Sequence, residues 1–178
     1  GKESGSWGSK IKALAAVAEA AGAQVLSINY REGEGGQLFD QDAPGEPERR
    51  VGQLLATPLP LHSQLILVGS SMGGYVSTVA SAALKPDGLF LLAPAFYLPG
   101  YAEQTLAPQA RQTLLVHGWG DAVVPAAHSV AFACQHRVAL HLLDGDHRLN
   151  DALPAIEPLF AQFLAQVMQT SAAAPSAA

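Results

Sequence analysis

The sequence predicts an α/β protein in which a mostly parallel, doubly wound sheet lies between two layers of helices, a three-layer sandwich. Short runs dense in Leu, Val and Ile indicate strands that are buried on both faces. Helix-like stretches separate these runs, and such alternation is typical of right-handed crossovers between parallel strands. Ligands of such sheets bind at the carboxyl ends of the strands. Functional residues are therefore expected in the loops that follow the strands.

The elements are expected in a regular order along the chain. Strands are expected at residues 24–30, 64–69, 88–93, 112–117 and 138–144. Helices are expected at residues 9–21, 47–56, 72–84, 125–134 and after residue 150. Gly22 marks the end of the first helix, in which apolar residues recur at helical spacing. In the last helix, Pro158 either bends the helix or marks its first turn.

Length and composition indicate one globular domain. The 178 residues have room for a single domain, expected over residues 1–169, and the small-residue tail 170–178 is expected to be flexible. A hydrophobic content of 49% with only 14% charged residues excludes disorder for the body of the chain. No apolar run approaches the roughly 18 residues that span a membrane.

Charge and cysteine usage exclude several classes of function. The net charge is −5 and the basic residues are scattered, which argues against nucleic acid as a partner. The lone Cys134 can form neither an intrachain disulfide nor a Cys-x-x-Cys pair, and it favours a reducing compartment, so a cytoplasmic location is expected. The histidines lack metal-binding spacing and the carboxylates do not cluster around them. Neither a metal nor another cofactor is expected.

The segment LVGSSMGGY, residues 67–75, leads from an apolar strand into a small-residue helix through a Gly-x-Ser-x-Gly turn. The pattern requires a glycine two residues before and two residues after the serine, because a tight strand-to-helix turn leaves no space for side chains. Gly69, Ser71 and Gly73 satisfy this register, whereas Ser70 does not. Ser71 is therefore the expected nucleophile.

The same turn supplies a candidate oxyanion donor. It places Ser71 at a helix N-terminus, where the backbone N–H of Met72 points to the position at which an oxyanion develops. Glycine-rich turns of this kind also bind phosphate. The sequence has neither Gly-Lys-Ser/Thr nor Gly-x-Gly-x-x-Gly here, so the nucleophile is the favoured interpretation.

A serine hydroxyl is a poor nucleophile at neutral pH, so Ser71 needs a histidine base and an acid that orients the histidine. His147 follows the last expected strand and is placed on the same rim as Ser71; alternatively, it is a polar loop residue. Asp121 follows the preceding strand and is the expected orienting acid, while Asp144 and Asp146 compete for this role. His117 ends the strand before Asp121 and is expected to shape the turn that presents it.

The segments GSSMGGY, HGWGDAVVP and GDHRL, at these separations, resemble the α/β-hydrolase superfamily, in particular its small bacterial serine esterases, over nearly the whole chain. The resemblance implies a minimal α/β-hydrolase fold with a short lid and a triad in the order Ser, Asp, His. It also implies a second oxyanion donor, the N–H of Lys2. It places a further strand between those ending at Tyr30 and Gly69, so about 10 or more residues are expected before Gly1.

The substrate is expected to be a small ester. Phe96, Tyr97 and Trp119 are candidates for the wall of an acyl pocket, although covering the core is an equally good interpretation. The segment after the third expected strand is too short for a helical cap. We therefore predict a serine hydrolase that cleaves small carboxylic esters through an acyl-enzyme. The alternatives are a thioesterase or acyltransferase, a serine peptidase of the same fold, and a non-catalytic binding module; the sequence does not determine the oligomeric state.

Overall fold

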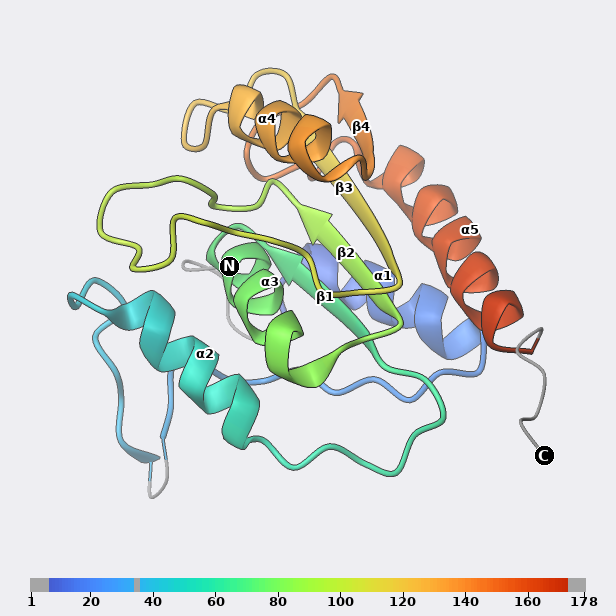
Figure 1. Ribbon diagram of the computed structural model, residues 1–178, viewed down its shortest axis with the longest axis horizontal. Coiled ribbons are helices and arrows are strands. Elements are labelled where there is room, and N and C mark those ends of the chain that lie inside the picture. The colour runs from blue at the N-terminus through green and yellow to red at the C-terminus, as the bar shows by residue number, and fades with distance from the viewer. Residues whose placement is uncertain (1–6, 34–35, 173–178) are drawn as a thin grey trace.

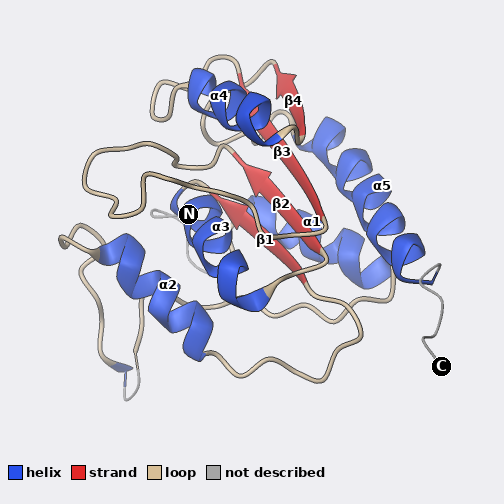
Figure 2. Cartoon of the chain, viewed as in Figure 1, coloured by secondary structure: helices blue, strands red, loops and turns tan. Residues whose placement is uncertain are grey.

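The computed structural model describes residues 7–33 and 36–172. A four-stranded parallel sheet forms the centre of the fold (Figure 1). Its strands are β1 (Ile66–Ser70), β2 (Gly88–Leu92), β3 (Gln112–Gly118) and β4 (Ala139–Leu143). They are neighbours in this order, and each pair is parallel. All four carboxyl ends therefore lie at one edge of the sheet, where the arrowheads in Figure 2 point.

Helices cover both faces of this sheet. They are α1 (Ser9–Ala20), α2 (Glu46–Ala56), α3 (Met72–Leu84), α4 (Ala126–His136) and α5 (Leu153–Ala172). α1 and α5 lie on one face of the sheet, and α2, α3 and α4 lie on the other (Figure 1). Side chains of α1 and α5 share one core with the sheet, while those of α2, α3 and α4 share the other. In β2, Phe90 and Leu92 face the first core, and Leu89 and Leu91 face the second, as the alternation along a strand requires. The predicted doubly wound α/β sandwich is confirmed.

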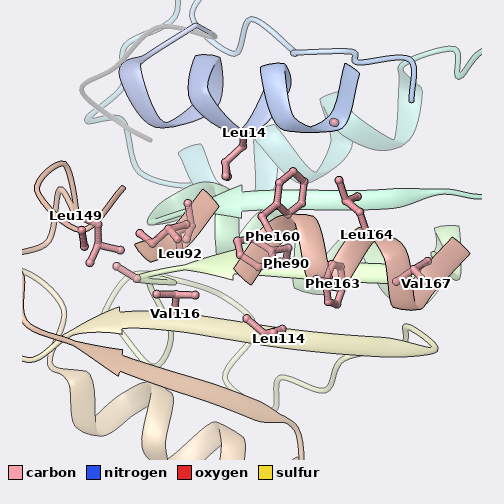
Figure 3. Close-up of a cluster of buried hydrophobic side chains, with 14 residues drawn as sticks. Leu14, Phe90, Leu92, Leu114, Val116, Leu149, Phe160, Phe163, Leu164 and Val167 are labelled. Carbon is pink, nitrogen blue, oxygen red and sulfur yellow. The ribbon is translucent and has the colours of Figure 1, made fainter. Parts of the chain in front are cut away.

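Aromatic side chains fill the core between the sheet and α5. In Figure 3, Phe90 of β2 lies against Phe160 and Phe163 of α5, with ring centroids 4.8 and 5.5 Å apart. Leu14 of α1 borders the same cluster. Each buried side chain of this size stabilises the fold by about 1.5–3 kcal/mol. This packing holds α1 and α5 on the sheet and thereby fixes the loop that precedes α5.

The helices begin and end close to the predicted positions, with one difference in α5. This helix begins at Leu153, so Pro158 lies inside it and does not mark its first turn. It continues to Ala172, into the segment that was expected to be flexible, while residues 173–178 lie outside the described part. None of the described helices is long and apolar enough to cross a membrane.

The predicted first strand, residues 24–30, is wrong for the described structure. Residues 23–29 form an irregular segment, because a strand exists only when a neighbour pairs with it. β1 is at the edge of the sheet, and a cleft of about 550 Å³ lies between it and this segment. Val25, Ile28 and Val68 are among the apolar residues that line the cleft. The strand expected here from a segment before Gly1 lies outside the described residues.

Candidate active site

Ser71 lies at the sharp turn between β1 and α3. Its backbone has φ +56° and ψ −123°, a conformation that L-residues rarely adopt. Hydrogen bonds hold the turn in place: the Ser71 N–H donates to the Leu92 carbonyl at 2.9 Å, and the Ser71 carbonyl accepts from the N–H groups of Gly74 and Ala95 at 2.8 and 3.0 Å. The turn is therefore fixed to the end of β2 as well as to α3.

Close backbone contacts explain two of the glycines around this turn. A Cβ at Gly69 would lie 2.3 Å from the carbonyl oxygen of Gly73, and a Cβ at Gly74 would lie 2.9 Å from the Cα of Pro94. A Cβ at Gly73, in contrast, would meet no described atom within 4 Å. The crowding that the sequence pattern predicts therefore falls on Gly69 and Gly74, because the backbone of residue 73 itself fills the space above Gly69.

His147 lies between Ser71 and Asp121, in the loop from β4 to α5. Its Nε2 is 2.9 Å from the Ser71 Oγ, and its Nδ1 is 2.7 Å from the Asp121 Oδ2. These distances fit a serine hydroxyl that donates to Nε2 and an Nδ1–H that donates to the carboxylate. The structure thus brings together the three side chains that the sequence singles out.

The turn after β3 and the loop after β4 are joined by their backbones. The N–H of Trp119 donates to the Leu143 carbonyl, and the N–H of Gly120 donates to the Gly145 carbonyl, each at 2.9 Å. Asp146, which competed with Asp121 in the sequence, accepts from the N–H of Arg148 at 2.8 Å within its own turn. The competing carboxylate therefore shapes the loop, while Asp121 contacts the imidazole.

The carboxylate of Asp121 is completely buried and accepts hydrogen bonds at both oxygens. Its Oδ1 accepts from the N–H groups of Val123 and Val124, both at 2.8 Å. Burial by itself raises the pKa of Asp121, but these two N–H donors and His147 outweigh burial and lower the pKa below its ordinary value. Asp121 is therefore held as a carboxylate.

A second imidazole, His117, also contacts Asp121. Its Nε2 lies 2.9 Å from the Asp121 Oδ2 and 3.0 Å from the Val124 carbonyl oxygen, as a residue that shapes this turn should. Its Nδ1 lies 2.7 Å from the Oγ of Ser129 on α4. Burial lowers the pKa of His117 although the contacts with Val124 and Asp121 oppose this effect. Ser129 was not singled out from the sequence, since nothing in its spacing links a helix residue to this turn.

The N–H of Met72, the first residue of α3, is free to act as an oxyanion donor. None of the hydrogen bonds among the described residues uses it, as expected for the first turn of a helix. The helix dipole adds positive potential at the same position. Lys2, the second expected donor, lies outside the described residues.

The three candidates for the pocket wall differ in exposure. Phe96 is fully buried and packs against Phe132 in the core, with ring centroids 4.5 Å apart. Tyr97 is half-buried and Trp119 is 65% exposed, so these two have surface that a substrate can touch. The cleft of about 550 Å³ lies along β1, and Ser71, Asp121 and His147 are not among its lining residues. This cleft is therefore separate from the side chains of Ser71, His147 and Asp121.

The described residues offer no obvious metal site. Across residues 7–33 and 36–172, no three His, Cys, Asp or Glu side chains come together in a way that could hold a metal ion. The histidine nitrogens nearest to Asp121 are occupied by hydrogen bonds to Ser71, Ser129 and the carboxylate itself. What the arrangement offers is acid–base chemistry at a serine hydroxyl.

Comparison with known proteins identifies the fold. A protein assigned to the α/β-hydrolase superfamily, from Xanthomonas campestris pv. campestris, is 29% identical, with a TM-score of 0.77 over 93% of this chain and 95% of that chain. An α/β serine hydrolase without a lid from Xanthomonas campestris is 24% identical, with a TM-score of 0.65 over 88% and 72% of the two chains. Est1E from Butyrivibrio proteoclasticus, bound to ferulic acid, is 18% identical, with a TM-score of 0.74 over 95% and 87%. No family model and no curated protein matches the chain.

These similarities extend over nearly the whole chain and show that it has the fold of the α/β-hydrolase superfamily. The superfamily fold inferred from the three sequence motifs is therefore confirmed, while the serine esterase type stays a prediction. The hydrolase that is 29% identical supports hydrolase activity in general for this chain.

Proposed function

We propose that this protein is a serine hydrolase that cleaves small carboxylic esters through an acyl-enzyme on Ser71. The observation that carries the proposal is the continuous chain of contacts from the Ser71 Oγ through the two nitrogens of His147 to the Asp121 carboxylate. Such a chain can activate a serine hydroxyl and has few uses in a non-catalytic protein. The strained backbone of Ser71 supports the same proposal, because strain of this kind gathers at functional sites.

In the first half of the reaction, the Ser71 Oγ attacks the carbonyl carbon of the ester while its proton passes to His147 Nε2. Asp121 accepts a hydrogen bond from the Nδ1–H of His147 and stabilises the resulting imidazolium. The proton itself stays on His147. The negative charge on the carbonyl oxygen faces the Met72 N–H, and a donor of this type contributes about 3–4 kcal/mol. When the tetrahedral intermediate collapses, the alcohol leaves with the proton from His147 and the acyl group stays on Ser71.

In the second half, water takes the place of the alcohol. His147 removes a proton from the water molecule, whose oxygen attacks the acyl carbon, and the proton then passes to the Ser71 Oγ as the carboxylic acid leaves. The proposed second oxyanion donor, the N–H of Lys2, would act in both halves. The proposal needs no cofactor.

The shape of the site favours small substrates. Residues 93–111, between β2 and β3, contain no helix and therefore form no helical cap over Ser71. Tyr97, which follows β2, and the exposed Trp119, which follows β3, offer aromatic surface at the carboxyl end of the sheet, where Ser71 also lies. Est1E, which shares the fold, binds ferulic acid, a small aromatic acid. Small esters, including aromatic ones, are therefore the proposed substrate class.

Labelling with a fluorophosphonate probe tests the nucleophile. We expect the wild-type protein to be labelled and Ser71→Ala to remain unlabelled. Ser70→Ala is the matched control, since it removes the same hydroxyl from the neighbouring residue of the turn, and it should label like the wild type. Failure of the wild type to react would overturn the proposal, as would labelling of Ser71→Ala.

The substrate class is tested with p-nitrophenyl esters of increasing acyl length, acyl-CoA thioesters and peptide amides. We expect kcat/KM to be highest for short or aromatic esters, because residues 93–111 form no helical cap that could enclose a long acyl chain. A clear preference for thioesters would indicate a thioesterase or acyltransferase, and cleavage of the amides alone would indicate a peptidase. Labelling without turnover of any of these compounds would argue against the ester substrates.

A further inference from the structure

His117 sits behind Asp121 and is not part of the proposed triad. Its side chain is fully buried, and both of its nitrogens have partners: Asp121 and the Val124 carbonyl at Nε2, and Ser129 at Nδ1. It comes from the end of β3, Ser129 comes from α4, and they meet beneath the turn that carries Asp121. His117 therefore connects the orienting carboxylate to the packed interior.

The partners fix the position of the protons on His117. Both atoms that face Nε2, the Asp121 Oδ2 and the Val124 carbonyl oxygen, are acceptors, so Nε2 must carry a proton and donate to them. Nδ1 faces only a hydroxyl, which can donate. In the neutral ring that burial favours, the Ser129 O–H donates to Nδ1 and selects the Nε2–H tautomer.

One carboxylate oxygen consequently receives two imidazole N–H groups. The Asp121 Oδ2 accepts from His147 Nδ1 at 2.7 Å on one side and from His117 Nε2 at 2.9 Å on the other. The two histidines have similar partners, since the other ring nitrogen of each contacts a serine hydroxyl. His147 Nε2 contacts Ser71 in the turn after β1, and His117 Nδ1 contacts the buried Ser129 of α4.

We propose that His117, with its tautomer set by Ser129, is a positioning residue whose Nε2–H shares the Asp121 Oδ2 with His147 and limits how strongly the carboxylate attracts the His147 proton. This inference rests on the proposed function, because it assigns His147 the role of base. A carboxylate oxygen that already accepts a second hydrogen bond is less basic, so it stabilises the imidazolium of His147 less strongly.

Other charged groups around the pair remain the same when only His117 is changed. Lys10 on α1 interacts electrostatically with Asp121 and Asp146, and Asp146 and Arg148 flank His147 in its loop. The groups contributed by the turn before α3 and by α4, Ser71 and Ser129, are neutral hydroxyls. A change in pH dependence after substitution of His117 is therefore attributable to the lost N–H donor.

A measurement on the wild-type protein tests the proton positions without any assay of activity. NMR of the protein labelled with ¹⁵N and ¹³C in histidine reports the tautomer and the charge of each ring. We expect His117 to remain the neutral Nε2–H tautomer from pH 8 to about pH 5.5. An Nδ1–H tautomer, or protonation of His117 within this range, overturns the proposal whether or not the protein is a hydrolase.

Two variants separate the donor from the rest of the side chain. His117→Gln can place its amide N–H near the position of Nε2 and so keep the hydrogen bond to Asp121. The shorter side chain of His117→Asn reaches only the position of Nδ1, so the hydrogen bond to Asp121 is lost. For His117→Asn we expect the acid limb of the kcat/KM profile to move up by ~0.5 pH unit or more and the plateau to fall ~10-fold, since the carboxylate is also less well placed. His117→Gln should return the acid limb to within ~0.2 pH unit of the wild type.

Ser81→Ala is the control for simple loss of stability. Ser81 is a fully buried serine of α3 that hydrogen-bonds to the Thr78 carbonyl and to the N–H of Gln109, far along the helix from Ser71. It should lower the melting temperature and leave the acid limb in place. If His117→Asn behaves like Ser81→Ala, the proposal is wrong while the proposed function stands. If the wild type fails to react with fluorophosphonates, the proposed function fails, and the NMR result decides the hydrogen bonds of His117 alone.

Discussion

Glu46 and Asp121 are two buried carboxylates that are stabilised in different ways. The side chain of Glu46, at the start of α2, is 2% exposed, and that of Asp121 is 0% exposed. Burial alone raises the pKa of a carboxyl group, yet in both cases the partners outweigh burial and lower the pKa. The contrast lies in the kind of partner and in its distance along the chain.

The partners of Glu46 are permanent cations from its own helix. Arg49 and Arg50, three and four residues later, contact it at 2.6 Å. Those of Asp121 are two backbone N–H groups and two imidazoles, and one of these, His147, lies 26 residues away. Fixed cations stabilise a fold but leave no proton to transfer. The backbone N–H groups and the imidazoles keep Asp121 charged without placing a permanent cation beside it.

The largest expected effect is on catalysis, at Asp121. Asp121→Asn should lower kcat for a p-nitrophenyl ester by roughly 10⁴-fold, because the amide no longer selects the tautomer of His147 that accepts the serine proton. Circular dichroism and thermal unfolding should remain close to those of the wild type. A loss of less than 10-fold would argue that another group orients His147.

The corresponding change at Glu46 should act on stability. Glu46→Gln leaves Arg49 and the buried Arg50 without their anion, and removing one member of a buried ion pair costs about 3–5 kcal/mol. Urea unfolding measures this loss, and kcat per folded molecule should stay within about twofold because α2 supplies no group to the site. If the free energy of unfolding falls by less than 1 kcal/mol, the ion pairs of Glu46 with Arg49 and Arg50 do not stabilise the fold as their burial suggests.

The third prediction concerns pH and the neutral donor His117. Because burial lowers its pKa in the folded state, the unfolded chain binds a proton below pH ~6.5 that the folded protein does not. Stability is then lost as the pH falls from about 6.5, by up to ~1.4 kcal/mol per pH unit from this residue.

Denaturant unfolding between pH 5 and pH 7 measures this slope. His117→Gln cannot be protonated, so its unfolding free energy should depend less steeply on pH than that of the wild type. Equal slopes in the two proteins would show that His117 is protonated in the folded state.

The smallest effect is expected at an ion pair whose cation is exposed. Asp87 pairs with Arg111 at 3.2 Å, and the Arg111 side chain is 51% exposed. Arg111→Ala should change the free energy of unfolding by about 0–1 kcal/mol, since exposed ion pairs gain little over hydration. If Arg111→Ala lowered the free energy of unfolding as much as Glu46→Gln, burial would not explain the difference between the ion pairs of Asp87 and Glu46.

Much of the architecture follows from local sequence. The runs of branched apolar residues give β1 to β4 within a few residues of their observed ends, and Gly69-x-Ser71-x-Gly73 predicts the turn with Ser71 at its tip. These features are local, because a buried strand or a tight turn imposes its own residue pattern. Residues 24–30 had a strand-like composition as well, but a strand also requires a partner, which composition does not report.

The sequence by itself determined the doubly wound α/β fold, the tight turn that carries Ser71 and the rim on which Asp121 and His147 lie. The tertiary structure decided which carboxylate faces the imidazole, and it placed His117 and Ser129 behind Asp121. It also showed that a side chain after Ser71 would clash at Gly74, and not at Gly73 as the sequence pattern predicts. The physical reason is that strand and turn propensities act between neighbours in the chain. Hydrogen bonds and close contacts between distant segments, in contrast, depend on distances of a few tenths of an ångström that only packing sets.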